Sequence, residues 1–371
     1  MEKNLKKFFQ AFSILSGTII GVGFFSLPYI TFKVGILTIV FYFLILGSLV
    51  YFLHSIFAQL CFQTPDFKRL PGFAKFHLGS FWEKIAFLIT VVGAEGTLLA
   101  YLIVGGEFLN EIFLKIFEIK NFGFWVYFFL GCLFIFSGRK LIAKIEQISL
   151  FLMVFVLIFI FLWHHSLIDL KNFPIKPDFS KIFLPYGPII FSLWGASLIP
   201  EIEETLRENK KLVKPVIFCS IFFSIVFYLL FIYLILGICG KNVSEYGILG
   251  LEKIIGEKTM ILLLILGTLT TFTSFITIGL TIKKVFWYDF KIQKDFSSFL
   301  TIFFPLFLYF LGLKKYIKII SFIGGVFLGI EGILYLLMYK KSQKKYRKIS
   351  LILICFLLFG IVAEFVNFFH T

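Results

Sequence analysis

Long apolar runs separated by short charged segments dominate the chain. A helix that crosses a bilayer needs about 20 mostly apolar residues. The pattern predicts eleven such spans, at residues 9–32, 35–61, 84–113, 122–138, 144–163, 184–206, 213–239, 258–285, 297–313, 317–339 and 348–369. The fourth and ninth are the shortest and are bounded by charges. We therefore predict an all-α polytopic membrane protein with about 11 transmembrane helices.

Composition and charge agree with this pattern. The chain is 59% hydrophobic and 15% charged, with a mean hydropathy of +0.97, whereas soluble domains are about 45–50% apolar. The net charge of +15 does not predict a nucleic-acid partner, because the basic residues cluster between apolar runs and mark topology. The partner indicated by these runs is the lipid bilayer.

The distribution of basic residues predicts the orientation. With the N-terminus in the cytoplasm, about two thirds of the lysines and arginines fall in cytoplasmic segments. We expect a multi-pass protein of the cell (inner) membrane with its N-terminus cytoplasmic and its C-terminus outside. The loop with Lys314, Lys315 and Lys318 runs against this bias.

Two of the apolar runs are interrupted by glycine and proline. The first break lies in Ser16–Pro28, and the second lies in Ser192–Pro200 of the sixth run. Lipid offers no hydrogen-bond partner, so an interrupted helix must have its freed backbone groups covered by neighbouring helices or presented to a ligand. The alternative is that the small residues only allow close helix packing.

The spacing of the spans indicates an internal repeat. Corresponding spans and the two breaks recur at an offset of roughly 175 residues. Residues 1–163 and 184–339 would each hold five spans, and residues 340–371 add an eleventh helix outside the repeat. Because five is odd, the second half must cross the membrane in the opposite direction. Paired broken spans in inverted halves mark a binding site in many transporters.

Three segments resemble a known superfamily. Residues 17–28 (GTIIGVGFFSLP), 100–107 (AYLIVGGE) and 185–204 (PYGPIIFSLWGASLIPEIEE) are similar to the first, third and sixth helices of the amino acid/polyamine/organocation superfamily. The hydroxy and aromatic amino acid permeases and their auxin/amino acid permease relatives are the nearest group. This resemblance implies a five-plus-five inverted repeat with substrate between helices one, three, six, eight and ten. It also implies amino acid uptake driven by a proton or sodium gradient.

The two breaks suit the two charges of an amino acid. Backbone N–H groups at a half-helix N-terminus favour a carboxylate, and freed carbonyls favour an ammonium group. Phe191, Trp194 and, by the resemblance, Tyr101 could wall the pocket or be ordinary core residues. The candidate substrate-binding residues are Thr18, Ile19, Gly21, Val22, Gly23, Tyr101, Phe191, Ser192, Trp194, Gly195 and Ala196.

Ionisable and hydroxyl side chains within the spans are candidates for ion coupling. Glu95 and Glu331 lie deep in apolar helices, where burial disfavours a charged carboxyl and makes it a proton carrier. The alternative is a neutral carboxyl bonded to a neighbouring helix. Thr273 and Ser274 could supply oxygen ligands to sodium, or bond back to their own helix. Glu364 is a further carboxyl, in the eleventh span.

These features predict a symporter that takes up an amino acid, aromatic or other neutral, with protons by alternating access. A sodium-coupled neutral amino acid symporter or exchanger is the alternative, and a passive pore or membrane-embedded enzyme is more remote. The sequence contains no HExxH or GxSxG motif and no metal-ligand spacing of cysteine and histidine. We therefore expect no enzymatic activity, no cofactor and no metal.

Overall fold

The computed structural model describes residues 2–65, 68–138, 142–342 and 347–370, and these ranges contain helices and loops but no β-strand. The longer helices are α1 (Glu2–Ile19), α2 (Leu27–Val34), α3 (Ile36–Gln63), α4 (Leu70–Leu78), α5 (Ser80–Phe117), α6 (Gly123–Ser137), α7 (Ile142–His164), α8 (Tyr186–Leu193), α9 (Ile199–Thr205), α10 (Val213–Cys239), α12 (Glu257–Lys284), α13 (Lys294–Phe310), α14 (Tyr316–Phe322), α15 (Gly329–Ser342) and α16 (Arg347–His370).

Short irregular elements join or interrupt these helices. The 3₁₀ turns are η1 (Val22–Ser26), η2 (His165–Leu167), η3 (Leu170–Asn172), η4 (Phe179–Lys181), η5 (Ala196–Leu198), η6 (Lys210–Leu212), η7 (Gly240–Asn242) and η8 (Ile248–Leu251), and α11 is a single turn (Glu252–Ile255). Two π-helical segments, η9 (Val285–Asp289) and η10 (Ile323–Leu328), continue α12 and join α14 to α15.

The helices correspond closely to the predicted spans. Among the described residues, six continuous helical stretches are long and apolar enough to cross a membrane, and the pair Asn4–Ile19 and Val22–Val34, bent by 48°, makes a seventh. The remaining predicted spans, 122–138, 144–163, 184–206 and 297–313, coincide with α6, α7, α8–α9 and α13. The largest difference is at the first span, whose helix begins at Glu2 because the helix continues through the lysine-rich segment before the apolar run.

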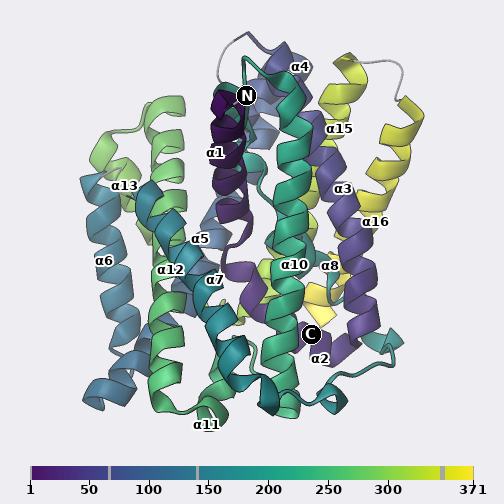
Figure 1. Ribbon diagram of the computed structural model, residues 1–371. Helices are drawn as coiled ribbons and strands as arrows, with labels where there is room; N and C mark the ends of the chain where they lie inside the picture. Colours follow the sequence, from purple (N-terminus) through teal and green to yellow (C-terminus); the bar gives the residue numbers. More distant parts are fainter. Residues whose placement is uncertain (1, 66–67, 139–141, 343–346, 371) are drawn as a thin grey trace.

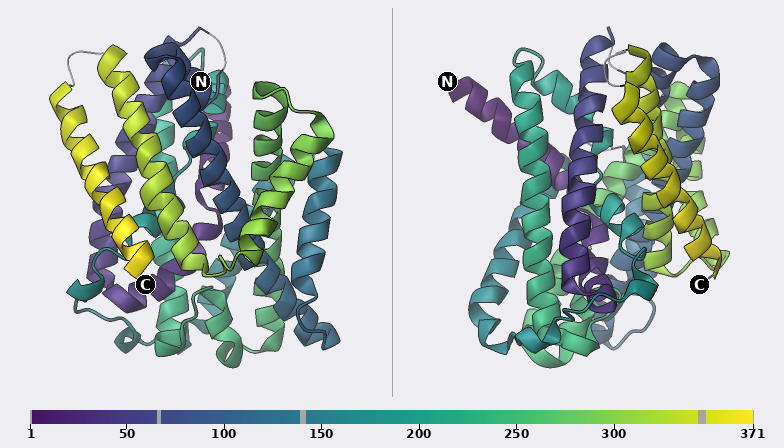
Figure 2. Two further views of the ribbon diagram at one scale, coloured as in Figure 1. Left: turned by 180° about the vertical axis from the view of Figure 1, so that it is seen from behind. Right: turned by 90° about the vertical axis from the view of Figure 1, so that its right-hand side faces the viewer.

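The two broken helices run in opposite directions. The chain starts at the end of the molecule that carries α4, and α1 leads to α2 at the opposite end; α8 and α9 return toward the α4 end (Figure 1). The C-terminus lies toward the end opposite the N-terminus. Figure 2 shows α16 on the outside of the bundle beside α15, with which it packs.

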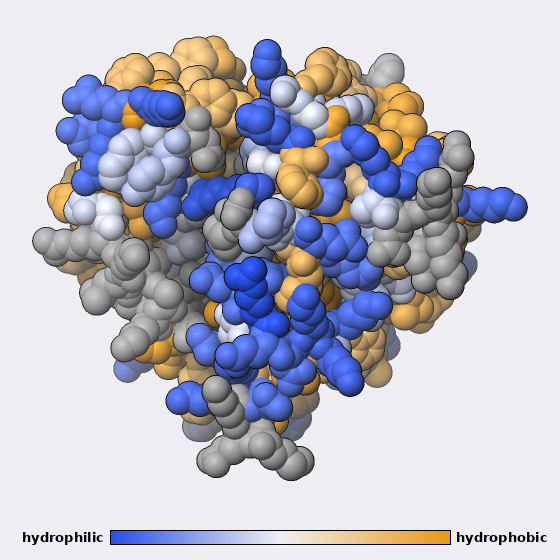
Figure 3. Space-filling model, turned by 90° about the horizontal axis from the view of Figure 1, so that it is seen from above, coloured by the Kyte–Doolittle hydropathy of each residue, from blue (hydrophilic) through white to orange (hydrophobic). Residues whose placement is uncertain are grey.

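The surface is that of a protein surrounded by lipid. Large apolar side chains are exposed along the helices; Leu44 is 67% and Phe129 is 62% exposed. Seen from the α4 end, hydrophilic residues gather over the middle of the face and hydrophobic residues lie mainly toward its edge (Figure 3). The apolar belt and the polar end indicate the membrane-embedded and aqueous parts of the molecule.

The short helix α4 was not predicted from the apolar runs, because it is too short to span a bilayer. Its sequence has apolar residues at helical spacing, namely Leu70, Phe73 and Ala74, and all three are buried. It begins with Pro71 in the first turn and ends at Gly79, whose φ of 106° favours glycine. It packs against α5 and α15.

Both broken helices restart in the same way. After the first break, α2 carries Pro28 in its first turn, and after the second break, α9 carries Pro200 in its first turn. Proline lacks an N–H and has a fixed φ, so it suits the first turn of a helix and not its interior. The prolines therefore define where regular helix resumes beyond each break.

Candidate functional site

The first break frees backbone groups that tyrosines then bind. The N–H of Ile20 still donates to Ser16, at 2.9 Å, as the last bond of α1. The N–H of Val22 instead donates to the hydroxyl of Tyr101 on α5, at 3.2 Å. The carbonyl of Val22 accepts from the hydroxyl of Tyr316 on α14, at 2.5 Å. The N–H of Val22 is thus bonded to a side chain and not to α1, and its carbonyl, at the start of η1, also accepts from a side chain.

A third tyrosine joins the two breaks. The hydroxyl of Tyr228, on α10, lies 2.7 Å from the carbonyl oxygen of Ile19 and 2.7 Å from that of Ser192. The side chain is fully buried. A phenolic hydroxyl has one proton, so it can donate fully to only one of these carbonyls at a time. Two carbonyls from different half-helices therefore converge on one donor, and the carbonyl of Ile19 also accepts from the N–H of Gly21, at 2.9 Å.

Glycines bring the breaks into direct contact. A Cβ added at Gly23 would lie 2.4 Å from Ser192 Oγ and 2.8 Å from Phe191 Cδ1. At Gly21 it would lie 2.3 Å from the Tyr101 hydroxyl, and at Gly195 it would lie 2.7 Å from Leu15 Cδ1. A larger residue at any of these three positions would have to displace the neighbouring side chains.

The structure brings one group of the predicted substrate-binding residues together. Gly21, Val22 and Gly23 face Tyr101, Phe191 and Ser192 across the contact just described. These residues are buried, apart from Phe191, which is partly exposed. The first break is therefore closed from solvent in this conformation.

The remaining predicted residues lie at the edges of this group. Thr18 and Ile19 belong to the regular helix α1, and the Thr18 hydroxyl donates to Ile14 O at 3.0 Å. The break is thus shorter than the sequence indicated, and Ile19 contributes only its carbonyl. Gly195 and Ala196 follow Trp194 in the second break, and the Trp194 ring is nearly parallel to Tyr335 of α15, with centroids 6.2 Å apart.

The two predicted proton carriers occupy different surroundings. Glu95 is 4% exposed, and neither carboxyl oxygen has a hydrogen-bond partner among the described residues. The carboxyl of Glu331 accepts from the hydroxyl of Tyr335, one turn further along α15. No hydrogen bond joins Glu95 to Glu331 within the described ranges, so the two carboxyls are not a bonded pair.

The hydroxyl-rich helix α12 bonds largely to itself. Thr273 donates to Thr270 O at 3.1 Å, and Thr270 and Thr271 donate to carbonyls one turn earlier. Ser274 is buried on the same helix. Bonds from hydroxyls to their own helix were the alternative to a sodium site. Sodium binding by Thr273 and Ser274 therefore stays a prediction.

Sequence reasoning missed three residues at the site. Tyr228 and Tyr316 are two of 15 tyrosines, and nothing in their local sequence separates them from the others. His54 on α3 is fully buried, and neither ring nitrogen has a partner among the residues described; its ring lies 5.3 Å from that of Trp194. A histidine within an apolar span was a usable signal for this position.

Comparison with solved structures supports the fold. The structure of MhsT in complex with L-phenylalanine superposes with a TM-score of 0.61 at 16% identity, covering 96% of this chain and 97% of that one. The inward-facing conformation of Mhp1 superposes with a TM-score of 0.70 at 11% identity, covering 92% of this chain and 77% of that one. The Eremococcus coleocola manganese transporter, in complex with an aromatic bis-isothiourea substituted compound, superposes with a TM-score of 0.65 at 12% identity. The match covers 97% of this chain and 87% of that one.

No curated protein matches the chain. The model of the tryptophan/tyrosine permease family matches residues 4–364, which is almost the full length and includes both breaks. The solved neighbours share the broken-helix fold expected from the sequence. The chain is therefore a multi-pass membrane transporter and not an enzyme, and it belongs to the tryptophan/tyrosine permease family.

Proposed function

We propose that this transporter takes up an amino acid, aromatic or other neutral, together with protons, by alternating access. The observation that carries the proposal is the convergence of freed backbone groups from both breaks on tyrosine hydroxyls. These groups are one N–H donor and three carbonyl acceptors, which are the complements of a carboxylate and an ammonium group.

In this mechanism the tyrosines stand in for the substrate. Tyr101 accepts from the N–H of Val22 where a substrate carboxylate would accept, and Tyr228 donates to the carbonyls of Ile19 and Ser192 where an ammonium would donate. An arriving zwitterion replaces these bonds, and buried polar groups remain satisfied throughout. Because Tyr228 bridges both breaks, its displacement also releases one half-helix from the other.

Aromatic side chains around the breaks support an aromatic substrate. Phe191 contacts Gly23, and Phe24 and Phe25 are fully buried directly after the first break. The family description and the binding of L-phenylalanine by MhsT, which has the same fold, support the same class. We propose Phe191 and Trp194 as walls of the side-chain pocket.

Proton coupling is supported by Glu95. Its carboxyl is buried and has no hydrogen-bond partner among the residues that the structure describes, and intramembrane carboxyls are costly and usually functional, so it is a place for a proton to bind. Glu331, already bonded to Tyr335, is the second candidate. Sodium coupling through Thr273 and Ser274 remains the alternative.

We further propose that residues 1–163 and 184–339 form the inverted repeat, with α16 outside it. The opposite directions of α1–α2 and α8–α9 support this division. The lysine-rich end that carries the N-terminus would face the cytoplasm of the cell (inner) membrane. Arg139, Lys140, Lys344 and Lys345, which contribute to that bias, lie outside the described residues.

The test is a transport assay in proteoliposomes. Labelled tryptophan or tyrosine is offered to vesicles preloaded with each of the twenty amino acids, and pH and sodium gradients are imposed separately. The proposal expects counterflow with aromatic or other neutral amino acids and accumulation driven by a pH gradient. Accumulation driven only by sodium would favour the alternative, and dissipative flux without counterflow would exclude a carrier.

A further inference from the structure

A buried carboxyl on α16 joins three helices. Glu364 is 2% exposed. Its Oε1 accepts from the backbone N–H of Gly187, at 3.1 Å, in the first turn of α8. Its Oε2 accepts from the hydroxyl of Ser321, at 2.9 Å, near the end of α14. Thus α16, which lies outside the two proposed halves, holds α8 against α14.

The backbones at this junction pack without intervening side chains. A Cβ added at Gly187 would lie 2.2 Å from Ser321 O, and one at Gly324 would lie 2.0 Å from Gly187 O. At Gly325 it would lie 2.1 Å from Cγ of Glu364. Gly324 and Gly325 belong to the π-helical segment η10, an irregularity that is frequent at functional sites. The carboxyl therefore sits where α8 meets this irregular segment.

The groups around Glu364 are neutral donors and tyrosines. Among the described residues, Tyr186 of α8 and Tyr42 of α3 are titratable groups near it. On α14 the basic residue is Lys318, and on α15 the acidic residue Glu331 is bonded to Tyr335. Among the described residues no ion pair joins Glu364 to a basic side chain. In the part of the chain that the structure describes, two hydrogen bonds and the positive end of α8 support its charged form.

We propose that Glu364 is a proton-binding site that controls the attachment of α8. Without a proton, both oxygens accept, and α8 is held to α14 and α16. A proton on Oε2 reverses the bond with Ser321, whose hydroxyl can also accept. It leaves the N–H of Gly187 bonded to a neutral oxygen, which is a weaker acceptor than a charged one, so the hold of α16 on α8 weakens. This inference rests on the proposed proton-coupled function and adds a coupling group that lies outside both halves.

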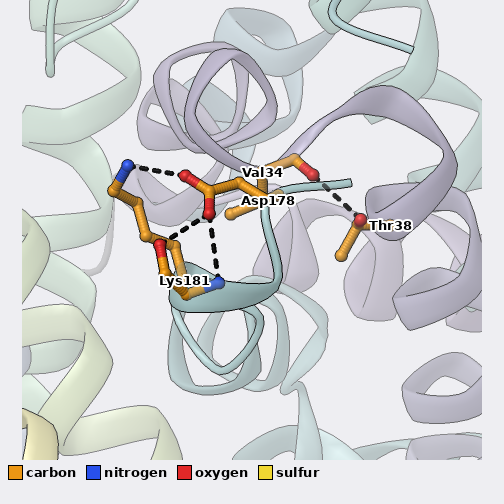
Figure 4. Close-up of polar contacts among 5 residues, drawn as sticks. Val34, Thr38, Asp178 and Lys181 are labelled. Atoms are coloured by element: carbon orange, nitrogen blue, oxygen red, sulfur yellow. Dashed lines mark hydrogen bonds and ion pairs between the residues drawn. The ribbon is translucent and has the colours of Figure 1, made fainter. Parts of the chain in front are cut away.

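The start of α8 borders a cavity, and the segment before it is bonded to neighbouring helices. A cavity of about 420 Å³ lies between α3 and α16, lined by apolar residues and by Tyr42 and Tyr186. The preceding loop is fastened to the corner of α2 and α3: Asp178 N–H donates to Val34 O at 3.4 Å, and Ile36 N–H donates to Pro174 O at 2.9 Å. Figure 4 shows this corner, where Asp178 also binds Lys181.

The experiment measures the pH dependence of counterflow in proteoliposomes with equal pH on both sides. Wild-type protein is compared with Glu364→Gln, Glu364→Asp and Glu257→Gln, the last of which alters an exposed carboxyl at the start of α12. A single proton site changes its occupied fraction by up to about tenfold per pH unit. We expect a pH-dependent rate in wild type, Glu364→Asp and Glu257→Gln, and a profile flattened to less than about twofold between pH 5 and 8 in Glu364→Gln.

Ser321→Ala keeps the carboxyl and removes one donor, so it decides the outcome if Glu364→Gln does not fold. Because the charged carboxyl then loses a hydrogen bond, the midpoint of the pH profile should move to higher pH. A wild-type profile in either Glu364→Gln or Ser321→Ala overturns the proposal. Wild-type counterflow that does not depend on pH also overturns it, while the proposed amino acid transport stands. Absence of amino acid counterflow in wild type would instead refute the proposed function.

Discussion

Removing the hydroxyl of Tyr228 should destabilise the protein without substrate and leave the substrate-bound protein nearly unchanged. In the structure this hydroxyl bonds the carbonyls of Ile19 and Ser192, and the Tyr228 side chain is fully buried. A buried acceptor left without a donor costs about 1–3 kcal/mol. Tyr228→Phe should therefore destabilise the empty form by about that amount and leave the bound form, in which an ammonium serves the carbonyls, nearly unchanged.

The consequence is tighter binding. Since about 1.4 kcal/mol corresponds to a tenfold change in an equilibrium constant, the affinity for the amino acid should rise roughly 5- to 150-fold. Thermal unfolding in detergent, followed with and without the amino acid, measures both effects: a lower melting temperature for the empty variant and a larger increase on adding substrate.

Tyr233→Phe is the matched control, because it makes the same change on the same helix at a residue that is 37% exposed. Its stability and affinity should equal those of wild type. Weaker substrate binding by Tyr228→Phe, with unchanged stability of the empty form, would show that the hydroxyl binds substrate directly and would refute the replacement mechanism.

Three further predictions follow from the packing and the charges. Gly187→Ala places a Cβ 2.2 Å from a backbone oxygen that cannot move aside; we expect about 1–3 kcal/mol of destabilisation, seen as a lower melting temperature, and a wild-type melting temperature would contradict the packing. Gly21→Ala meets only the end of the Tyr101 side chain, at 2.3 Å, so it should fold normally but weaken substrate binding at least about tenfold in a binding assay, since a direct backbone contact is blocked; unchanged affinity would remove Gly21 from the site. Hydrogen bonds from Lys181 and Ser180 lower the pKa of Asp178 to about 2 from its ordinary 3.8. Because this pKa is lowered in the folded protein, the contribution of Asp178 to folded-state stability is present above pH 3.8 and is lost as the pH falls through about 2. Proteolysis of the loop before α8 should therefore be faster for Asp178→Asn than for wild type at pH 7. Equal rates would show that Asp178 does not order the loop.

The helices could be predicted because the bilayer imposes a simple rule on sequence. A span must be apolar over a fixed length, so the predicted seventh span, 213–239, coincides with α10, and the predicted second span, 35–61, ends two residues before α3 does. The breaks were visible for the same reason, since glycine and proline are conspicuous in an apolar run. α4 lies outside this rule because its length is set by packing on α5 and α15.

The partners of the freed backbone groups could not be predicted. Tyr228 and Tyr316 reach the breaks from helices that are distant in sequence, and their positions depend on how α10 and α14 pack. The same holds for Glu364, which the sequence identifies as an intramembrane carboxyl but does not connect to Gly187 and Ser321. The extent of the first break was also overstated, because Thr18 and Ile19 still belong to the regular helix α1 despite the glycines on either side, and only the carbonyl of Ile19 turns to Tyr228.

Hydrogen–deuterium exchange on the purified transporter, with and without a bound aromatic amino acid, tests most directly whether the two breaks bind substrate. Peptides that cover Ile19–Gly23 and Phe191–Ala196 are compared with peptides from the middle of α13 as a reference. We expect substrate to change exchange at both breaks together and to leave α13 unaffected. Saturable binding that leaves both breaks unchanged would contradict it.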